Sequence, residues 1–190
     1  MNTQRFISLL TMAVLFLTAS CDREKTDNQQ LEGGDNMKQL QLTSSAFSEG
    51  EMIPAQFTCE GKDISPPLSW TGVPEEAESL ALIVDDPDAP AGTWVHWVVY
   101  NIPTAMTELP ENFPPVEKAK NGLTQGMNDF KKIGYGGPCP PSGTHRYFFK
   151  VYALSEELNL DPGATKQELT DAMEGKVVAQ GALMGKYSRR

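Results

Sequence analysis

The segment Leu80-Ala-Leu-Ile-Val84, followed at once by Asp85-Asp86-Pro87-Asp88, decides the fold class of this chain. An unbroken aliphatic run of this length, ended by a proline turn, is typical of a β-strand that is buried on both faces. Two further segments, Trp94–Tyr100 (WVHWVVY) and His145–Ala153 (HRYFFKVYA), are rich in aromatic and β-branched residues, which favour strands. These segments predict the main strands of a sheet.

Two more segments, Gln39–Phe47 and Ile53–Phe57, are weaker strand candidates. Prolines recur at every connection between residues 48 and 145, and because proline interrupts helices they exclude long helices there. The 14 Pro and 16 Gly of the chain are also more than a helical bundle would carry.

Helix is predicted only near the C-terminal end of the chain. Thr165 and Glu168 form a capping-box pattern, apolar residues follow at helical spacing, and Gly175 is a natural stop. The segment Val177–Met184, interrupted by a glycine, is a candidate for a second short helix. The fold class is therefore mostly β, with one or two C-terminal helices packed on a sheet.

Length and charge restrict the classes of function. A chain of 190 residues is long enough for one domain with a hydrophobic core of its own. Its formal net charge of −9 argues against nucleic acid as a partner, because binding phosphates takes clustered Lys and Arg. The chain has 2 histidines, His96 and His145, so a site with three histidine ligands is excluded.

Residues 1–20 are expected to be a signal rather than part of the fold. Phe6–Leu17 is an apolar run too short to span a bilayer, and small residues lead directly into Cys21. This pattern resembles a bacterial lipoprotein signal, in which Cys21 is lipidated; the alternative is an ordinary cleaved signal with an incidental cysteine. Residues 21–37 then form a polar, flexible tether, and residues 38–190 form the folded domain. We expect a membrane-anchored lipoprotein of the bacterial cell envelope, which contacts the membrane through its lipid alone.

Side chains alternate between the two faces of a strand, so each aromatic segment places one histidine among aromatic residues. The expected sets are Trp94, His96, Val98 and Tyr100 in one strand, and His145, Tyr147, Phe149 and Val151 in the other. Asp86 and Asp88 follow the buried strand directly and are expected at the rim of the sheet.

The glycine-rich stretch Gly134–Pro138 precedes the second histidine strand, and its backbone N–H groups are candidates for an anion-binding nest. Each of these features also has a purely structural interpretation. Histidines in strands are often hydrogen-bonded structural residues, aspartates beside proline are often turn formers, and Gly-Gly-Pro is often only a loop. From the residues alone, a shared polar pocket and these structural roles both stay open.

Three ordered blocks of the sequence resemble the signature of the phosphatidylethanolamine-binding protein family, most closely its bacterial Raf-kinase-inhibitor-like branch. Two shorter segments, Phe57–Gly61 and Ile64–Trp70, are also similar to that branch. The blocks are Asp86-Pro-Asp-Ala-Pro90, Gly92-Thr-Trp-Val-His96-Trp97 and Gly137-Pro-Cys-Pro-Pro-Ser-Gly-Thr-His145-Arg-Tyr147.

The resemblance implies a β-sandwich-like fold with a large central sheet, a smaller sheet and C-terminal helices. It also implies a small pocket for phosphate, phosphorylated head groups or acetate-like anions. The C-terminal region that helps to close this pocket in eukaryotic members has no clear counterpart here. The residues that the resemblance places in the pocket are Asp86, His96, Gly137, His145 and Tyr147, with Pro90 and Trp94 shaping its wall.

Two cysteines, Cys59 and Cys139, remain when Cys21 is assigned to the lipid. An even remainder in an exported protein predicts a disulfide, which would tie the loop around Gly137 to the segment around Phe57. The alternative is two free buried thiols.

Three functions compete. The first is a non-enzymatic binding protein for a small anionic or phosphorylated ligand. Because the family that the sequence resembles also includes inhibitors of kinases and proteases, the resemblance also implies a kinase or protease as a possible protein partner. The second is a metal-dependent enzyme that uses a two-His, one-carboxylate ligand set. The third is a hydrolase based on Ser142 and His145, although no Gly-x-Ser-x-Gly motif is present. We favour the binding protein, with no cofactor and no metal.

Overall fold

Three long antiparallel strands form the centre of the protein. The computed structural model describes residues 37–189. In it, β4 (Ser79–Asp86) lies between β5 (Trp94–Pro103) and β8 (Thr144–Leu154) and is hydrogen-bonded to both. All eight residues of β4 are buried. The prediction of a central strand buried on both faces is therefore confirmed.

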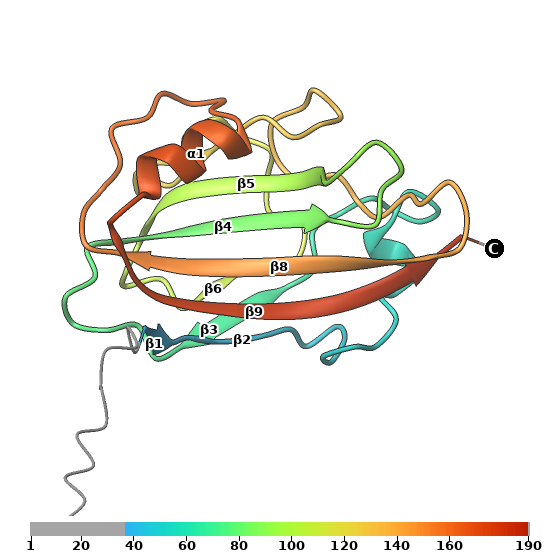
Figure 1. Ribbon diagram of the computed structural model, residues 1–190, viewed down its shortest axis with the longest axis horizontal. Coiled ribbons are helices and arrows are strands. Elements are labelled where there is room, and N and C mark those ends of the chain that lie inside the picture. The colour runs from blue at the N-terminus through green and yellow to red at the C-terminus, as the bar shows by residue number, and fades with distance from the viewer. Residues whose placement is uncertain (1–36, 190) are drawn as a thin grey trace, which may run out of the picture. The chain divides into compact units, whose positions relative to one another are not determined.

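The large sheet has six strands in the order β1-β9-β8-β4-β5-β7 (Figure 1). The long C-terminal strand β9 (Val177–Ser188) pairs with β8 along nearly its whole length. The short strand β1 (Lys38–Gln39) is parallel to β9, and β7 (Thr124–Gln125) closes the other edge against β5.

A small sheet covers one face of the large one. Its strands are β2 (Gln41–Thr43), β3 (Leu68–Thr71) and β6 (Glu108–Leu109), in the order β2-β3-β6. Trp70 of the small sheet shares a buried core with Leu82 and Val84 of β4. The predicted sandwich of a large and a smaller sheet is thus confirmed.

Helix α1 (Lys166–Met173) covers the opposite face (Figure 1). Leu169 and Met173 pack in a second core with Ala81 and Ile83, so alternate residues of β4 supply two different cores. The continuous aliphatic sequence of β4 follows from this, because neither face meets water.

One set of contacts fixes where α1 begins, and another ties it to the large sheet. The predicted capping box is present: the Thr165 backbone N–H donates to Glu168 Oε2 at 2.7 Å, and the Glu168 N–H donates to Thr165 Oγ1 at 3.3 Å. The buried Asp85 carboxylate accepts from Lys166 Nζ at 2.5 Å and from Lys150 Nζ at 2.8 Å. Asp85 therefore joins β4, β8 and α1 through charge-assisted hydrogen bonds.

The expected second helix over Val177–Met184 is wrong, because this segment belongs to β9. Its burial alternates with the period of a strand: Ala179, Gly181 and Leu183 are buried, and the residues between them are more exposed. The hydrogen bonds to β8 outweigh the weak helix preference of a short sequence that contains two valines and a glycine.

Of the two weaker strand predictions, one is partly confirmed and the other is wrong. Gln39–Phe47 contains only β2 and the second residue of β1. Ile53–Phe57 is not a strand: Ala55–Phe57 forms a short 3₁₀ helix, η1, directly after Pro54. Proline lacks the N–H that a strand needs at this point, and only Met52 makes a bridge, to Lys186 of β9.

Several predictions concern residues outside the described part of the chain. These are the signal peptide over residues 1–20, the lipidation of Cys21 and nearly all of the tether over residues 21–37. Among residues 37–189, no helix combines the length and the apolar composition needed to cross a membrane.

The close approach of β9 to the chain segment before β2 requires a glycine. A Cβ atom on Gly181 would lie 2.1 Å from the carbonyl oxygen of Leu40. We predict that Gly181→Ala lowers the free energy of unfolding by about 1–3 kcal/mol, because the overpacked backbone must shift. Chemical denaturation measures this difference. Gln180→Ala, at an exposed position of the same strand, should change stability by less than about 0.5 kcal/mol, and equal effects of the two substitutions would contradict the prediction.

Candidate functional site

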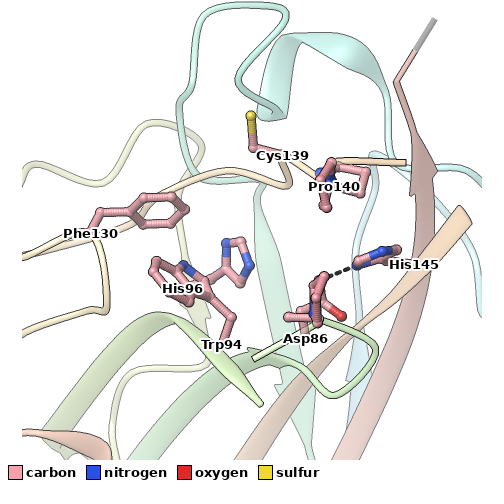
Figure 2. Close-up of a pocket in the computed structure, with 10 residues that line it drawn as sticks. Asp86, Trp94, His96, Phe130, Cys139, Pro140 and His145 are labelled. Carbon is pink, nitrogen blue, oxygen red and sulfur yellow. Dashed lines mark hydrogen bonds and ion pairs between the residues drawn. The ribbon is translucent and has the colours of Figure 1, made fainter. Parts of the chain in front are cut away.

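A pocket of about 210 Å³ lies where β4 ends and β5 and β8 begin (Figure 2). Its polar lining consists of Asp86, His96 and His145, one residue from each of the three central strands. The rest of the lining is largely apolar, with the indole nitrogen of Trp94 and one disulfide cysteine as the exceptions: Ala89, Pro90, Trp94, Phe130, Cys139, Pro140 and Pro141.

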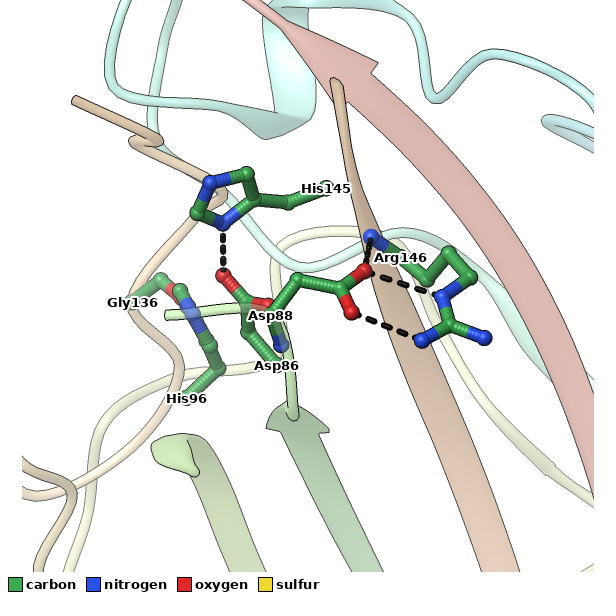
Figure 3. Close-up of polar contacts among 6 residues, drawn as sticks. All are labelled: Asp86, Asp88, His96, Gly136, His145 and Arg146. Carbon is green, nitrogen blue, oxygen red and sulfur yellow. Dashed lines mark hydrogen bonds and ion pairs between the residues drawn. The ribbon is translucent and has the colours of Figure 1, made fainter. Parts of the chain in front are cut away.

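His145 is held by a carboxylate from the neighbouring strand. Its Nδ1 donates to Asp86 Oδ2 at 2.7 Å, and both side chains are more than 90% buried (Figure 3). The other oxygen of Asp86 accepts the backbone N–H of Asp88 at 2.8 Å. Because a carboxylate oxygen accepts, the Nδ1 atom of His145 carries a proton, and Nε2 is the nitrogen left for a ligand.

The turn after β4 is clamped to β8 by a second acidic residue. Asp88 accepts from Arg146 Nε at 2.9 Å and from Nη2 at 2.7 Å, and its Oδ2 also accepts the Arg146 backbone N–H at 2.9 Å (Figure 3). The hydrogen bonds from the guanidinium lower the pKa of Asp88 to about 2. These hydrogen bonds hold the end of β4 beside the beginning of β8, and so keep Asp86 next to His145.

His96 is anchored to a backbone carbonyl instead. Its Nδ1 donates to the carbonyl oxygen of Gly136 at 2.6 Å, and the Gly136 N–H donates back to the His96 carbonyl at 2.9 Å. The ring is buried, and this burial lowers the pKa of His96, although Gly136 and nearby carboxylates act in the opposite direction. Burial therefore favours the neutral form of His96, and in that form Nδ1 carries the proton and Nε2 a lone pair.

A β-bulge in β5 turns His96 toward the pocket. Val84 of β4 pairs with Trp97, but the next residue, Asp85, pairs with Val95, so His96 is an extra residue in the ladder. The expectation that Trp94, His96, Val98 and Tyr100 all share one face is wrong for this reason. Trp94 and His96 line the pocket, whereas Val98 and Tyr100 lie in the core under α1.

Two polar atoms near the histidines are buried and have no hydrogen-bond partner among the described residues: Trp94 Nε1 and the Tyr147 hydroxyl. The Tyr147 ring lies edge-on to His96, with 5.2 Å between ring centroids, and Phe130 contacts Trp94 in the same manner at 5.4 Å. Burial first, and then the charge of Asp86, raises the pKa of Tyr147. Trp94 lines the pocket, and an unpaired buried donor such as its N–H carries a free-energy cost that an acceptor on a ligand would remove.

The structure brings most of the sequence-predicted site residues to one pocket. Asp86, Pro90, Trp94, His96 and His145 line it. Tyr147 contacts the His96 ring edge-on and is not part of the pocket lining.

In the predicted nest over Gly134–Pro138, the N–H groups of Gly136 and Gly137 are not available to an anion. The Gly137 N–H donates to Asp63 Oδ1 at 2.6 Å, and the Gly136 N–H donates to the carbonyl of His96. Gly137 also permits a close approach of two backbone segments, because a Cβ atom at this position would lie 2.6 Å from the carbonyl oxygen of Phe57. The N–H groups of Gly136 and Gly137 therefore bond within the protein.

The predicted disulfide between Cys59 and Cys139 is present, with 5.4 Å between the Cα atoms. The Cys59 N–H also donates to the Pro138 carbonyl at 3.1 Å. Together they tie the loop that lines one side of the pocket to the segment after η1, as expected.

Sequence reasoning did not assign Phe130 to the pocket. Phe130 lies in a loop with no local sequence motif. Two hydrogen bonds between Asp129 and the backbone of Val95 hold this loop at the site. Asp129 Oδ2 accepts the Val95 N–H at 2.7 Å, and the Asp129 N–H donates to the Val95 carbonyl at 3.0 Å. Ala89, Pro140 and Pro141 lie within or beside the quoted family blocks, so their positions in the sequence could have indicated them.

Neither enzymatic alternative gains support from the geometry. Among the described residues, no group of three or more His, Cys, Asp or Glu side chains is arranged to hold a metal ion. Within the same part of the chain Ser142 is exposed, and no hydrogen bond joins it to His145.

Comparison with known proteins identifies the family. Residues 43–188 match the phosphatidylethanolamine-binding protein family. A UPF0098 protein from Methanothermobacter thermautotrophicus is 53% identical over 150 residues, which cover 79% of this chain and 99% of that protein.

Two solved structures have the same fold. The Chlamydia trachomatis homologue CT736 is 45% identical, with a TM-score of 0.73, and E. coli YbcL is 36% identical, with a TM-score of 0.74. Each likeness covers 80% of this chain and 99% of the other. The chain belongs to the phosphatidylethanolamine-binding protein family.

Proposed function

We propose that this protein is a non-enzymatic binding protein whose pocket captures a small oxyanion, such as phosphate or a phosphorylated head group. The observation that carries the proposal is the convergence of two buried imidazoles, from β5 and β8, on one small pocket. Each ring has its Nδ1 anchored by the protein, so each Nε2 is left to face a ligand.

The surroundings of the two rings favour an oxyanion over other small ligands. Trp94 Nε1 is a buried donor without a partner among residues 37–189, and an acceptor oxygen on the ligand would satisfy it. The Asp86 carboxylate does not present bare oxygens to the ligand, because one accepts from His145 and the other from the Asp88 amide. The anion is therefore recognised by the few groups that line the pocket. The chain as a whole cannot attract it, because its net charge is −9.

The size of the pocket limits what can enter it. A volume of about 210 Å³ is below the roughly 300–1,000 Å³ typical of sites for drug-sized ligands. The apolar wall of Pro90, Phe130 and Pro141 would contact a short substituent on the anion. Phosphoethanolamine, which corresponds to the head group of the lipid after which the family is named, is a suitable probe. A kinase or protease partner stays a prediction.

Titration with phosphate and with phosphoethanolamine, followed by NMR of the histidine rings, tests the proposal. We predict that both ligands shift the His96 and His145 signals with one common dissociation constant for each ligand. In His145→Asn the constant should rise at least about tenfold, because a hydrogen bond to a charged group is lost. The asparagine amide can still donate to Asp86, so the fold should be retained.

Lys38→Ala is the matched control. Lys38 is an exposed cation on β1 that pairs with Glu76, on a different part of the protein from the pocket. Its loss should leave the dissociation constants unchanged within about twofold, which corresponds to the small effect of surface substitutions. If Lys38→Ala weakens binding as much as His145→Asn does, the anion binds by general charge attraction and the proposal is wrong.

We also propose that Cys21 carries a lipid that holds the pocket-bearing domain near a membrane. The support is the apolar run and the small residues that precede Cys21 in the sequence. Intact-mass measurement of membrane-extracted protein should give a chain that begins at Cys21 and carries acyl groups. Full-length protein, or a processed chain of unmodified mass, would contradict this proposal and leave the pocket unaffected.

A further inference from the structure

One wall of the pocket is a loop over residues 139–143, which we call the wall loop. It contributes Cys139, Pro140 and Pro141 to the lining, and Figure 2 shows Cys139 and Pro140 on the side of the pocket opposite Asp86. Within residues 37–189, no residue of the wall loop makes a hydrogen bond. The two prolines lack an N–H to donate, so the backbone of this loop can form few hydrogen bonds to the rest of the protein.

Both ends of the wall loop are fixed. Just before it, the Gly137 N–H donates to Asp63 Oδ1 at 2.6 Å. The Pro138 carbonyl accepts the Cys59 N–H at 3.1 Å, and after the loop β8 begins. Between these two ends, the disulfide of Cys139 with Cys59 is the one bond, covalent or hydrogen, that ties the loop to another segment of residues 37–189.

This disulfide is accessible from one end. Cys59 is exposed, as is Glu60 after it, whereas Cys139 is half-buried in the wall of the pocket. Exposed disulfides are the labile ones that exchange with thiols, whereas buried structural disulfides resist reduction. A thiol reagent can therefore reach Cys59 while the protein stays folded.

Opening the disulfide frees the wall loop and leaves the sheets intact. Neither of the two buried cores contains a residue of the loop. Pro140 is buried, but its ring makes only apolar contacts, which have no preferred direction and fix a position less sharply than a covalent bond does. The pocket then loses a fixed wall on the side opposite Asp86.

We propose that the Cys59–Cys139 disulfide is a site of reversible thiol–disulfide exchange that sets the affinity of the pocket for its anion. The oxidised form holds the wall loop in place and binds the anion, and the dithiol form binds it weakly. This inference rests on the proposed function and adds a means of controlling it. The reagent that opens the bond is a dithiol, and the reagent that closes it is a disulfide oxidant.

The exchange proceeds in two steps. A thiolate of the dithiol attacks the Cys59 sulfur, the bond between Cys59 and Cys139 breaks, and Cys139 leaves as a thiolate that takes up a proton from water. The second thiolate of the reagent then attacks its own sulfur in the mixed disulfide and releases Cys59, which is also protonated. Two electrons and two protons pass to the protein, and the dithiol becomes a cyclic disulfide. Oxidation reverses these steps.

Dithiothreitol, added to the folded protein without denaturant, tests the exchange. The reduced form should take up two more alkyl groups from iodoacetamide than the oxidised form, whatever the state of Cys21, and its circular dichroism should be unchanged. The dissociation constants of phosphate and phosphoethanolamine should then rise at least about fivefold, because the freed loop must be ordered again when the ligand binds. Reoxidation with glutathione disulfide should restore the original values.

NMR relaxation of the backbone amides tests the release of the wall loop without any ligand. The amides of Ser142 and Gly143 should have order parameters near about 0.85 in the oxidised form and below about 0.6 after reduction. The Gly137 amide should stay rigid in both forms, because Asp63 holds it independently of the disulfide.

Two variants serve as controls. The double variant Cys59→Ser, Cys139→Ser should have the affinity of the reduced protein and no response to dithiothreitol. Ser142→Ala changes an exposed residue of the same loop that makes no hydrogen bond within residues 37–189. It should keep the oxidised affinity within about twofold, together with the full response to reduction. If the double variant does not fold, the wild-type protein in its two redox forms decides the question.

The outcomes separate this inference from the proposed function. Equal affinities of the oxidised and reduced forms would overturn the control of binding and leave anion binding intact. Wall-loop amides that stay rigid after reduction, or a disulfide that opens only in denaturant, would overturn the proposed exchange site. If neither phosphate nor phosphoethanolamine binds either form, the proposed function is wrong, and the control of affinity is wrong with it.

Discussion

The antiparallel pairing of β4 with β5 on one side and with β8 on the other is the constraint on which the pocket depends. In this arrangement the end of β4 lies beside the beginnings of both neighbours. Asp86, His96 and His145 therefore come together, although 59 residues separate the first from the last. The two cores, one under the small sheet and one under α1, hold β4 in place and so hold the site.

The site gains its chemistry from the way each ring is anchored. A carbonyl and a carboxylate fix the two Nδ1 atoms, and both residues line the pocket, so the Nε2 atoms are the ring nitrogens left for a ligand. The bulge in β5 supplies the extra residue that turns His96 toward His145 instead of toward the core under α1. Without the bulge, strict alternation would place His96 on the same face as Val98, away from the small-sheet core to which Tyr147 belongs.

Much of the fold could be predicted from local sequence patterns. The aliphatic segment Leu80–Val84 and the aromatic segments beginning at Trp94 and His145 each carry a strong strand signal, and the capping box at Thr165 fixes the start of α1. The strand β9 could not be predicted in this way, because its sequence is rich in small residues and only the ladder with β8 makes it a strand.

For the site, too, the residues could be predicted from the nearby sequence, whereas contacts between distant segments could not. His96, His145 and Asp86 could be chosen from their types and positions, and the family blocks added Pro90 and Trp94. The sequence does not reveal that Asp63 occupies the Gly137 amide, because that bond spans 74 residues. The bulge at His96 likewise depends on pairing with another strand, so alternation along β5 alone gave the wrong face for Val98.

The protein holds both imidazoles through Nδ1, which leaves each Nε2 for a ligand in the same pocket, and the proposed function depends on this. ¹⁵N NMR of the histidine side chains distinguishes the two tautomers of each ring and tests this claim directly. At a pH where both rings are neutral, we expect both to show a protonated Nδ1 and an unprotonated Nε2, with one equivalent of phosphate perturbing both Nε2 signals together. A protonated Nε2 in either neutral ring, or a response confined to one ring, would contradict the claim.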